Sequence, residues 1–297
     1  MEQRGRVIAL GFFDGVHLGH GALLRRAAER AAELGAAPAA VTFDAHPEQV
    51  ILGRGAPLLT TPAERADLMR RRYGVEEVIV VPFDEALMRM DWRDFVTDLL
   101  IGRYGAVHLI AGHDFRFGYR GEGNGPRLEA LCAEKGIGCD IIPPVTVDGI
   151  TVSSTYIRTL VAQGEMERAN EFLGHPYQLT GQVGHGRKLG SRLGFPTVNL
   201  RVPPEGVTPA FGVYAAKVWV GEMSYIAAAN VGVRPTVETD GAVTAEGFLL
   251  DFDGDLYGET IRMEFYRHTR PERKFESMEA LRTQVMRDAE TVRQYFL

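Results

Sequence analysis

Two histidines, His17 and His20, lie three residues apart in the segment GFFDGVHLGH at residues 11–20. The segment lies where an apolar strand pattern ends and a helical pattern begins. At such a junction, free backbone NH groups and the positive end of the helix dipole favour a bound phosphate. Two imidazolium groups that face this anion could stabilise the charge that develops on it during group transfer. Gly15 and Gly19 would allow the backbone to approach the phosphate closely.

A cluster of hydroxyl side chains begins a later predicted helix, in the segment SSTYIR at residues 153–158. Ser154 and Thr155 offer hydroxyl and backbone donors, and Arg158 follows one turn further along on the same face. Together these groups could bind a leaving pyrophosphate. Taken alone, such a cluster is more often a helix N-cap and nothing more. Its position after the histidine segment favours the functional interpretation.

A glycine-rich segment, GHGRKLGSRLGFPTVN, occupies residues 184–199. Its glycines are Gly184, Gly186, Gly190 and Gly194. Glycines at this density allow the backbone to wrap around phosphates. Thr197 and Asn199 supply a hydroxyl and an amide at the end of the segment. We expect a turn or a kink beside Pro196 to bring these two side chains to the same side of the chain.

The elements that position the first two segments alternate between strands and helices. Strands are predicted at residues 7–13, 39–43, 77–81, 106–110 and 139–142, and helices at residues 19–34, 92–104 and 126–135. A further helix starts at TPAE, residues 61–64, because a hydroxyl cap, a proline and a glutamate follow in the order of a capping box. This alternation predicts an α/β doubly wound domain over residues 1–173.

The pattern changes after residue 174 to strands at short, regular spacing. They are predicted at residues 177–183, 212–220, 225–230, 247–252 and 260–266, with one helix at residues 277–296. A series of strands without helices between them predicts a small antiparallel β-barrel, here with a C-terminal helix, over residues 174–297.

Composition excludes several classes of partner. The 297 residues carry a formal net charge of -6, which argues against a nucleic-acid or anionic-membrane surface. No segment approaches the roughly 18 apolar residues of a membrane span. Cys132 and Cys139, the two cysteines, are too few for a disulfide framework or a zinc site. The amino-terminal residues do not resemble a signal peptide, so we expect a cytoplasmic protein.

The histidine segment resembles the HxGH signature of nucleotidyltransferases, and FDGVHLGH resembles the FMN adenylyltransferase half of the bacterial bifunctional riboflavin kinase/FAD synthetases. TFDAHP at residues 42–47 is similar to that family's TFxPHP segment, with Ala45 where proline is usual. AGHDFRFG at residues 111–118 and SSTYIR at residues 153–158 resemble two further segments of that family. The resemblance implies catalytic roles for His17 and His20. It implies nucleotide or phosphate binding by Gly11, Phe13, Asp14, Gly15, Gly19, Asp114, Ser154, Thr155 and Arg158, and flavin binding by Phe43 and Pro47.

The second half resembles the riboflavin kinase of the same family. GFPTVN is similar to the GFPTAN motif, which implies that Thr197 and Asn199 hold Mg²⁺ and that the four glycines bind the nucleotide. EGFLLDFDGDLYG, residues 246–258, resembles the segment that carries the catalytic glutamate, although Gly247 and Phe248 depart from the usual residues. Glu246 is then the general base for the riboflavin 5′-hydroxyl. RPERKF, residues 270–275, resembles the family's RxExKF loop, and this resemblance implies flavin contacts by Arg270 and Phe275.

The resemblance covers about residues 7–290, with at least six motifs in the expected order. It implies that riboflavin and ATP give FMN in the C-terminal half, and that FMN and ATP give FAD and pyrophosphate in the N-terminal half, both with Mg²⁺. The FMN phosphate would attack the α-phosphorus of ATP directly, without an enzyme nucleophile. Two alternatives are a chain with one of the two activities and a non-catalytic flavin- or nucleotide-binding regulator. A homo-oligomer is left open.

Overall fold

The computed structural model describes residues 4–46, 49–50, 53, 55–184, 197–233 and 241–297. The chain forms two compact units. The first contains Met1–Ala56 and Thr61–Ser153, and the second contains Pro57–Thr60 and Ser154–Leu297. The domain boundary between residues 173 and 174 stays a prediction. The two units divide instead between Ser153 and Ser154, so the helical residues 154–173 belong to the second unit.

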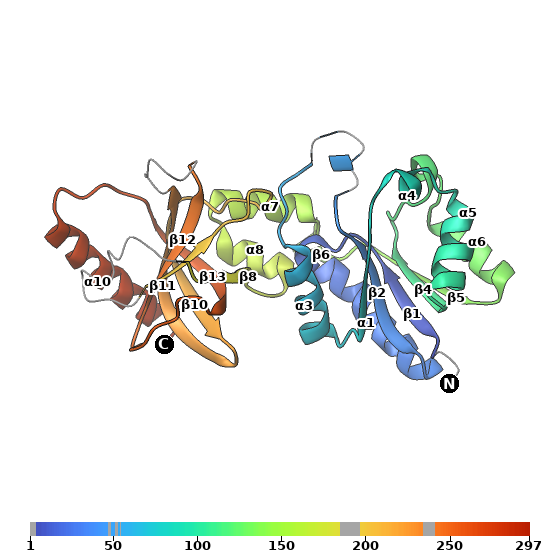
Figure 1. Cartoon of the computed structure of the whole chain (residues 1–297), viewed down its shortest axis with the longest axis horizontal. Coiled ribbons are helices and arrows are strands. Elements are labelled where there is room, and N and C mark those ends of the chain that lie inside the picture. Colours follow the sequence, from blue (N-terminus) through green and yellow to red (C-terminus); the bar gives the residue numbers. More distant parts are fainter. Residues whose placement is uncertain (1–3, 47–48, 51–52, 54, 185–196, 234–240) are drawn as a thin grey trace. The chain divides into compact units, whose positions relative to one another are not determined.

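The first unit is built on a parallel sheet with the strand order β3-β2-β1-β4-β5 (Figure 1). The strands are β1 (Arg6–Leu10), β2 (Ala37–Phe43), β3 (Glu77–Val81), β4 (Ala106–Gly112) and β5 (Gly138–Ile142). A two-stranded hairpin of β6 (Thr146–Val147) and β7 (Ile150–Thr151) follows. The strand order reverses at β1, which has β2 on one side and β4 on the other. The predicted doubly wound topology is confirmed.

Helices cover both faces of this sheet, and β1 alternates between them. Val7 and Ala9 pack with α1 (Leu18–Leu34) and α3 (Pro62–Tyr73). Ile8 and Leu10 pack with the other group of helices. That group contains α5 (Trp92–Asp94), the π-helix η2 (Phe95–Arg103) and α6 (Gly125–Lys135), and the short α4 (Glu85–Arg89) precedes it.

Local signals determine several of these boundaries. The capping box at the start of α3 is present, since the Thr61 backbone NH donates to Glu64 (2.8 Å) and the Glu64 NH donates to the Thr61 hydroxyl (3.2 Å). The first strand is shorter than predicted and ends at Leu10. Phe13 has a φ of 58°, which is incompatible with an extended strand, so residues 11–13 form a turn.

The second unit is an antiparallel half-barrel with the strand order β8-β13-β10-β11-β12-β9. Its strands are β8 (Tyr177–Gln182), β9 (Thr197–Arg201), β10 (Gly212–Val220), β11 (Met223–Val233), β12 (Val243–Leu249) and β13 (Thr260–Pro271). Strand β9 was not predicted as a strand. The predicted strand at residues 247–252 is wrong at its end, because β12 stops at Leu249 and Asp251 has a φ of 56°.

The described part of this unit contains the helices α7 (Ser154–Gln163), α8 (Met166–Leu173) and α10 (Met278–Tyr295). Asn170 of α8 bridges two strands, since its amide donates to the Phe265 carbonyl (2.8 Å) and accepts from the Tyr177 NH (2.7 Å). Val292 of α10 packs on Val213 and Ala228 of the sheet. Within the described ranges, no helix is long and apolar enough to cross a membrane.

Candidate active sites

Three predicted segments of the first unit follow three neighbouring strands. The histidine segment follows β1, the TFDAHP segment ends β2, and Asp114 lies two residues beyond β4. Carboxyl ends of parallel strands meet at one edge of a sheet, and ligands of doubly wound sheets bind where the strand order reverses. The Phe12 and His46 rings meet edge to face at 4.8 Å and join the first two segments. The tertiary structure thus brings these segments together.

The histidine pair is held by the start of α1. His17 is the N-cap, and its Nδ1 accepts a hydrogen bond from the His20 backbone NH (3.2 Å). The two imidazole rings stack with centroids 3.6 Å apart and an angle of 12° between their planes. A Cβ atom at Gly19 would lie 3.1 Å from His17 Cε1, so the small residue between the histidines permits this ring position.

The charge state of His20 differs from the expected imidazolium. Burial lowers the pKa of His20 well below its usual value, and the positive charges of His17 and Arg65 lower it further. His20 is therefore neutral at pH 7, with one ring nitrogen that donates and one that accepts. A bound phosphate next to the ring would raise this pKa again, because an anion favours the protonated form.

The turn before the histidines has an unusual backbone. Phe13, Gly15 and Val16 all have positive φ values, of 58°, 78° and 43°. Such a φ is strained for a β-branched valine, and strain of this kind costs about 1–3 kcal/mol and concentrates at functional sites. The Phe13 side chain is fully buried and lies against Gly11, so a nucleotide contact by Phe13 would come from its backbone.

The other predicted residues of this site differ in exposure. Asp14 is buried, whereas Asp114 is exposed, with His113 Nδ1 3.9 Å from its Oδ1. Phe43 is buried in the core and meets Phe83 edge to face at 5.5 Å, so its flavin contact stays a prediction. Pro47 lies outside the described residues.

The hydroxyl cluster belongs to the second unit. Ser154 and Thr155 start α7, and Arg158 follows one turn later, as expected for the helix start. The joint action of these residues with His17 and His20 stays a prediction.

Sequence reasoning missed Arg65, which lies on α3 between the motifs. Its side chain is fully buried, and its guanidinium lies 4.1 Å from the centre of the Phe12 ring. Its NH1 donates to the Thr42 hydroxyl (3.1 Å) and to the Phe43 carbonyl (3.2 Å). No spacing rule distinguishes this arginine from the exposed ones on the same helix.

The second unit places its predicted catalytic residues in a row across the sheet. Glu246 of β12 is directly opposite Asn199 of β9 on one side and Asn230 of β11 on the other. The row continues through Val213 of β10 to Arg270 of β13. Directly opposite residues share a face, with Cβ atoms about 4.5–5.5 Å apart. The Glu246 carboxylate therefore lies between two amides, one of which, Asn230, was not predicted to act there.

Thr197 and Asn199 need no kink to share a face, and Pro196, beside which a turn or kink was expected, lies outside the described residues. Strand β9 is regular, and residues two apart in a strand point to the same face, so both side chains share the face of Glu246 without any kink. Hydroxyl, amide and carboxylate oxygens are the ligands that Mg²⁺ prefers, so this set fits a magnesium ion. Among the described residues, no group of three or more His, Cys, Asp or Glu side chains could hold a metal.

The two atypical residues beside Glu246 point in opposite directions. Gly247 faces the inside of the half-barrel, where a Cβ atom would lie 2.9 Å from Met263 Cε and 3.2 Å from Val198 Cγ2. The glycine therefore serves packing, away from the Glu246 face. Phe248 shares that face and is directly opposite Thr197.

The predicted flavin residues of this unit are tied to α10. Arg270 donates to both carboxylate oxygens of Asp288, at 2.9 and 2.6 Å, and its guanidinium lies 5.9 Å from the Phe275 ring centre. This pair anchors the segment that was predicted to contact flavin. The Gly184 NH donates to the Asn199 carbonyl (3.1 Å), which fixes the start of the glycine-rich segment. Gly186, Gly190 and Gly194 lie outside the described residues.

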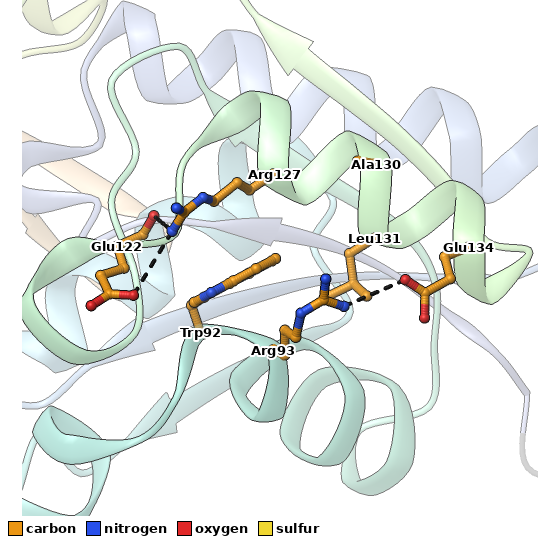
Figure 2. Close-up of a pocket in the computed structure, with 7 residues that line it drawn as sticks. All are labelled: Trp92, Arg93, Glu122, Arg127, Ala130, Leu131 and Glu134. Carbon is orange, nitrogen blue, oxygen red and sulfur yellow. Dashed lines mark hydrogen bonds and ion pairs between the residues drawn. The ribbon is translucent and has the colours of Figure 1, made fainter.

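A separate cavity of about 400 Å³ lies on the first unit beside α5 and α6 (Figure 2). Trp92 lies there between the guanidinium groups of Arg93 (4.8 Å) and Arg127 (5.3 Å). Both arginines face acidic partners, Glu134 at 3.4 Å and Glu122 at 3.9 Å. The cavity lining contains none of the predicted site residues, and its charges are already paired.

A pair of histidines at a helix start on a doubly wound sheet, followed by a half-barrel with a carboxylate opposite two amides, is the arrangement expected of a nucleotidyltransferase joined to a kinase. Family models for these two activities match the two parts of the chain. A family model described as FAD synthetase matches residues 1–156, and one described as riboflavin kinase matches residues 173–296. The chain belongs to the bifunctional riboflavin kinase/FMN adenylyltransferase family.

Relatives with that description cover nearly the whole chain. The protein of Listeria monocytogenes is 36% identical over 98% of this chain and 92% of its own length. That of Pseudomonas fluorescens is 37% identical over 98% and 93%. A crystal structure described as a macrolide-efflux protein from Streptococcus pneumoniae has a TM-score of 0.83 and 30% identity, and covers 99% of this chain and 95% of that one.

Proposed function

We propose that this protein makes FAD from riboflavin in two ATP-dependent steps, phosphorylation by the C-terminal half of the chain and adenylylation by the N-terminal half. The proposal rests on the two family matches, since the FAD synthetase match at residues 1–156 contains His17, His20 and Asp114, and the riboflavin kinase match at residues 173–296 contains Thr197, Asn199 and Glu246. We further propose that the enzyme acts in the cytoplasm and uses Mg²⁺ in both steps.

In the kinase step, Glu246 accepts the proton of the riboflavin 5′-hydroxyl as its oxygen attacks the γ-phosphorus of ATP, which gives FMN and ADP. Asn230, directly opposite Glu246, can orient the carboxylate through its amide NH₂. Thr197 and Asn199 offer oxygen ligands for Mg²⁺, which when bound neutralises charge on the nucleotide phosphates. Arg270 and Phe275 would hold the flavin.

In the adenylylation step, a phosphate oxygen of FMN attacks the α-phosphorus of ATP, and pyrophosphate leaves. The α1 amino terminus and the His17 and His20 rings contribute donors where charge develops. Ser154, Thr155 and Arg158 would bind the leaving pyrophosphate. Asp114, exposed beyond β4, would position the nucleotide or its ribose.

The test is to incubate the purified full chain with riboflavin, ATP and Mg²⁺ and to separate the products by chromatography. We expect FMN to appear first and FAD to follow. Accumulation of FMN without FAD would show that the chain has kinase activity but no adenylyltransferase activity, which is the one-activity alternative. No product at all would favour the non-catalytic flavin- or nucleotide-binding regulator and refute the proposal.

A further inference from the structure

We propose that Arg65 is a positioning residue for adenylyl transfer, which holds the loop after β1 and the end of β2 in the arrangement that the reaction requires. The proposal rests on the adenylyltransferase function proposed above. The contacts of Arg65 reach Phe12, Thr42 and Phe43, so it acts through the residues that it holds.

The contacts of Arg65 connect three chain segments. Its guanidinium stacks on Phe12, three residues before Gly15, at 4.1 Å from the ring centre. Its NH1 reaches the last two residues of β2, the Thr42 hydroxyl at 3.1 Å and the Phe43 carbonyl at 3.2 Å. The Thr42 hydroxyl donates in turn to the Phe12 carbonyl (2.8 Å). Helix α3, strand β2 and the loop after β1 therefore share one hydrogen-bonded cluster.

The Arg65 guanidinium also places a buried positive charge near the ends of β1 and β2. Arg65 is fully buried and Asp14 is 1% exposed, and the attraction of Asp14 opposes the effect of burial, which lowers the pKa of Arg65 to about 10. Arg65 is thus charged at pH 7. Its positive charge acts on His20, together with that of His17. A buried charge is costly to keep, so a residue that only filled space would be replaced by an apolar side chain at little loss.

The contacts of Arg65 do more than stabilise helix α3 itself. The helix start is already fixed by the Thr61–Glu64 capping box, which does not involve Arg65. The Arg65 side chain instead contacts Phe12, Thr42 and Phe43, which border the predicted FMN and ATP sites. The strained turn at Phe13 and Val16 lies directly after Phe12 and needs surroundings that hold it in place.

The experiment compares Arg65→Met and Arg65→Lys in the full chain, with adenylylation of supplied FMN as the readout. We expect Arg65→Met to lower kcat by about 10- to 100-fold, with KM for ATP changed less than about threefold, because a misplaced site costs rate more than affinity. Arg65→Lys should recover part of the loss, since it keeps the charge but lacks the planar fork. Riboflavin kinase activity of the same preparation should stay within about twofold.

A pH profile gives a readout that loss of packing alone would not change. The charged groups that act on His20 are His17 and Arg65. Removing the Arg65 charge should raise the apparent pKa seen in the adenylylation kcat, whereas Arg65→Lys should leave it near the wild-type value. An unchanged profile in Arg65→Met would refute the electrostatic part of the proposal.

Two further variants keep the test decisive. Thr42→Val removes only the hydroxyl that links Arg65 to Phe12, and we expect a loss of about 3- to 10-fold in kcat even if Arg65→Met does not fold. Arg71→Met, on the same helix and in an exposed pair with Asp67, is the matched control and should have no effect. Wild-type adenylylation in both Arg65→Met and Thr42→Val would overturn the proposal. Absence of adenylylation in the wild-type chain would instead refute the proposed function.

Discussion

The two units assemble their sites by different routes. In the first unit, the predicted site residues lie on loops after neighbouring parallel strands, beside a strained turn and the buried Arg65. In the second unit, Asn199, Glu246 and Asn230 lie within strands and are brought together by antiparallel pairing alone. A loop site depends on local packing, whereas a strand site depends on register, because a shift by one residue turns every side chain to the other face.

The strongest test of this division concerns Glu246. We expect Glu246→Gln to lower riboflavin phosphorylation by about 10²- to 10⁴-fold, as for loss of a general base, and to leave adenylylation of supplied FMN unchanged. Steady-state assays of both reactions on one preparation check this. Equal loss of both activities would contradict the separation of the two sites.

The reciprocal change concerns the histidine site. His20→Ala should lower adenylylation by about 10²- to 10³-fold, because a donor at the developing charge is lost, and should leave the kinase unchanged. His46→Ala is a control on the neighbouring loop and should have a smaller effect. Wild-type adenylylation in His20→Ala would remove this histidine from the mechanism.

A third change tests how strongly the second site depends on packing inside the half-barrel. In Gly247→Ala the new Cβ would lie 2.9 Å from Met263 Cε, so we expect the free energy of unfolding to fall by about 1–3 kcal/mol. Gly181→Ala is the matched control, since its Cβ would lie 3.4 Å from Leu200 Cδ2, an ordinary contact. Denaturant unfolding measures both. Equal stability of the two variants would show that Met263 moves aside without cost.

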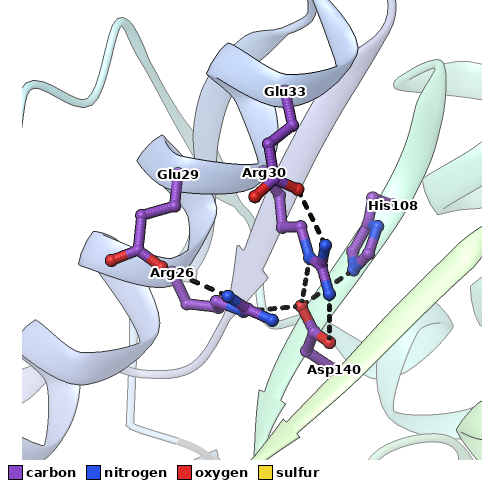
Figure 3. A network of polar contacts seen from close by, with 6 residues as sticks. All are labelled: Arg26, Glu29, Arg30, Glu33, His108 and Asp140. Carbon is purple, nitrogen blue, oxygen red and sulfur yellow. Dashed lines mark hydrogen bonds and ion pairs between the residues drawn. The ribbon is translucent and has the colours of Figure 1, made fainter.

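The smallest expected effect concerns a polar network of the first unit, away from the predicted site residues (Figure 3). Asp140 of β5 accepts from Arg26 Nε (2.9 Å), Arg30 Nε (2.9 Å) and His108 Nε2 (3.2 Å). Hydrogen bonding by Arg30, and then by Arg26, lowers the pKa of Asp140 to about 2. Because the network is partly exposed, we expect Asp140→Asn to cost only about 1 kcal/mol at pH 7.

The pH dependence of this contribution has a definite sign. The folded pKa lies below the unfolded value of about 3.9, so the stabilisation is complete above about pH 4 and is lost as the pH falls towards 2. The difference in unfolding free energy between wild type and Asp140→Asn should shrink over that range. Glu33→Gln, at an exposed partner of Arg30, is the control and should change stability by less than about 0.5 kcal/mol. A constant difference from pH 7 to pH 2 would contradict the assigned cause.

Sequence patterns were sufficient where the signal is local. The capping box fixed the start of α3, and alternating strands and helices gave the doubly wound topology. Strand β9 was missed because it begins directly after a glycine-rich segment that was interpreted as a phosphate loop. Helix α8 was missed although Met166, Ala169, Phe172 and Leu173 form a buried stripe at helical spacing and Gly174 ends the helix. Its place on the half-barrel depends on the contacts of Asn170 with distant strands, which no local pattern encodes.

The sequence by itself determined the family and the order of the two activities, and it predicted most of the candidate site residues, because these depend on short segments with fixed spacing. Only the tertiary structure decided that His20 is neutral, that Glu246 lies between Asn199 and Asn230, and that Arg65 reaches Phe12 and Thr42. Burial, strand register and contacts between distant segments depend on how the chain packs, and no local pattern encodes them.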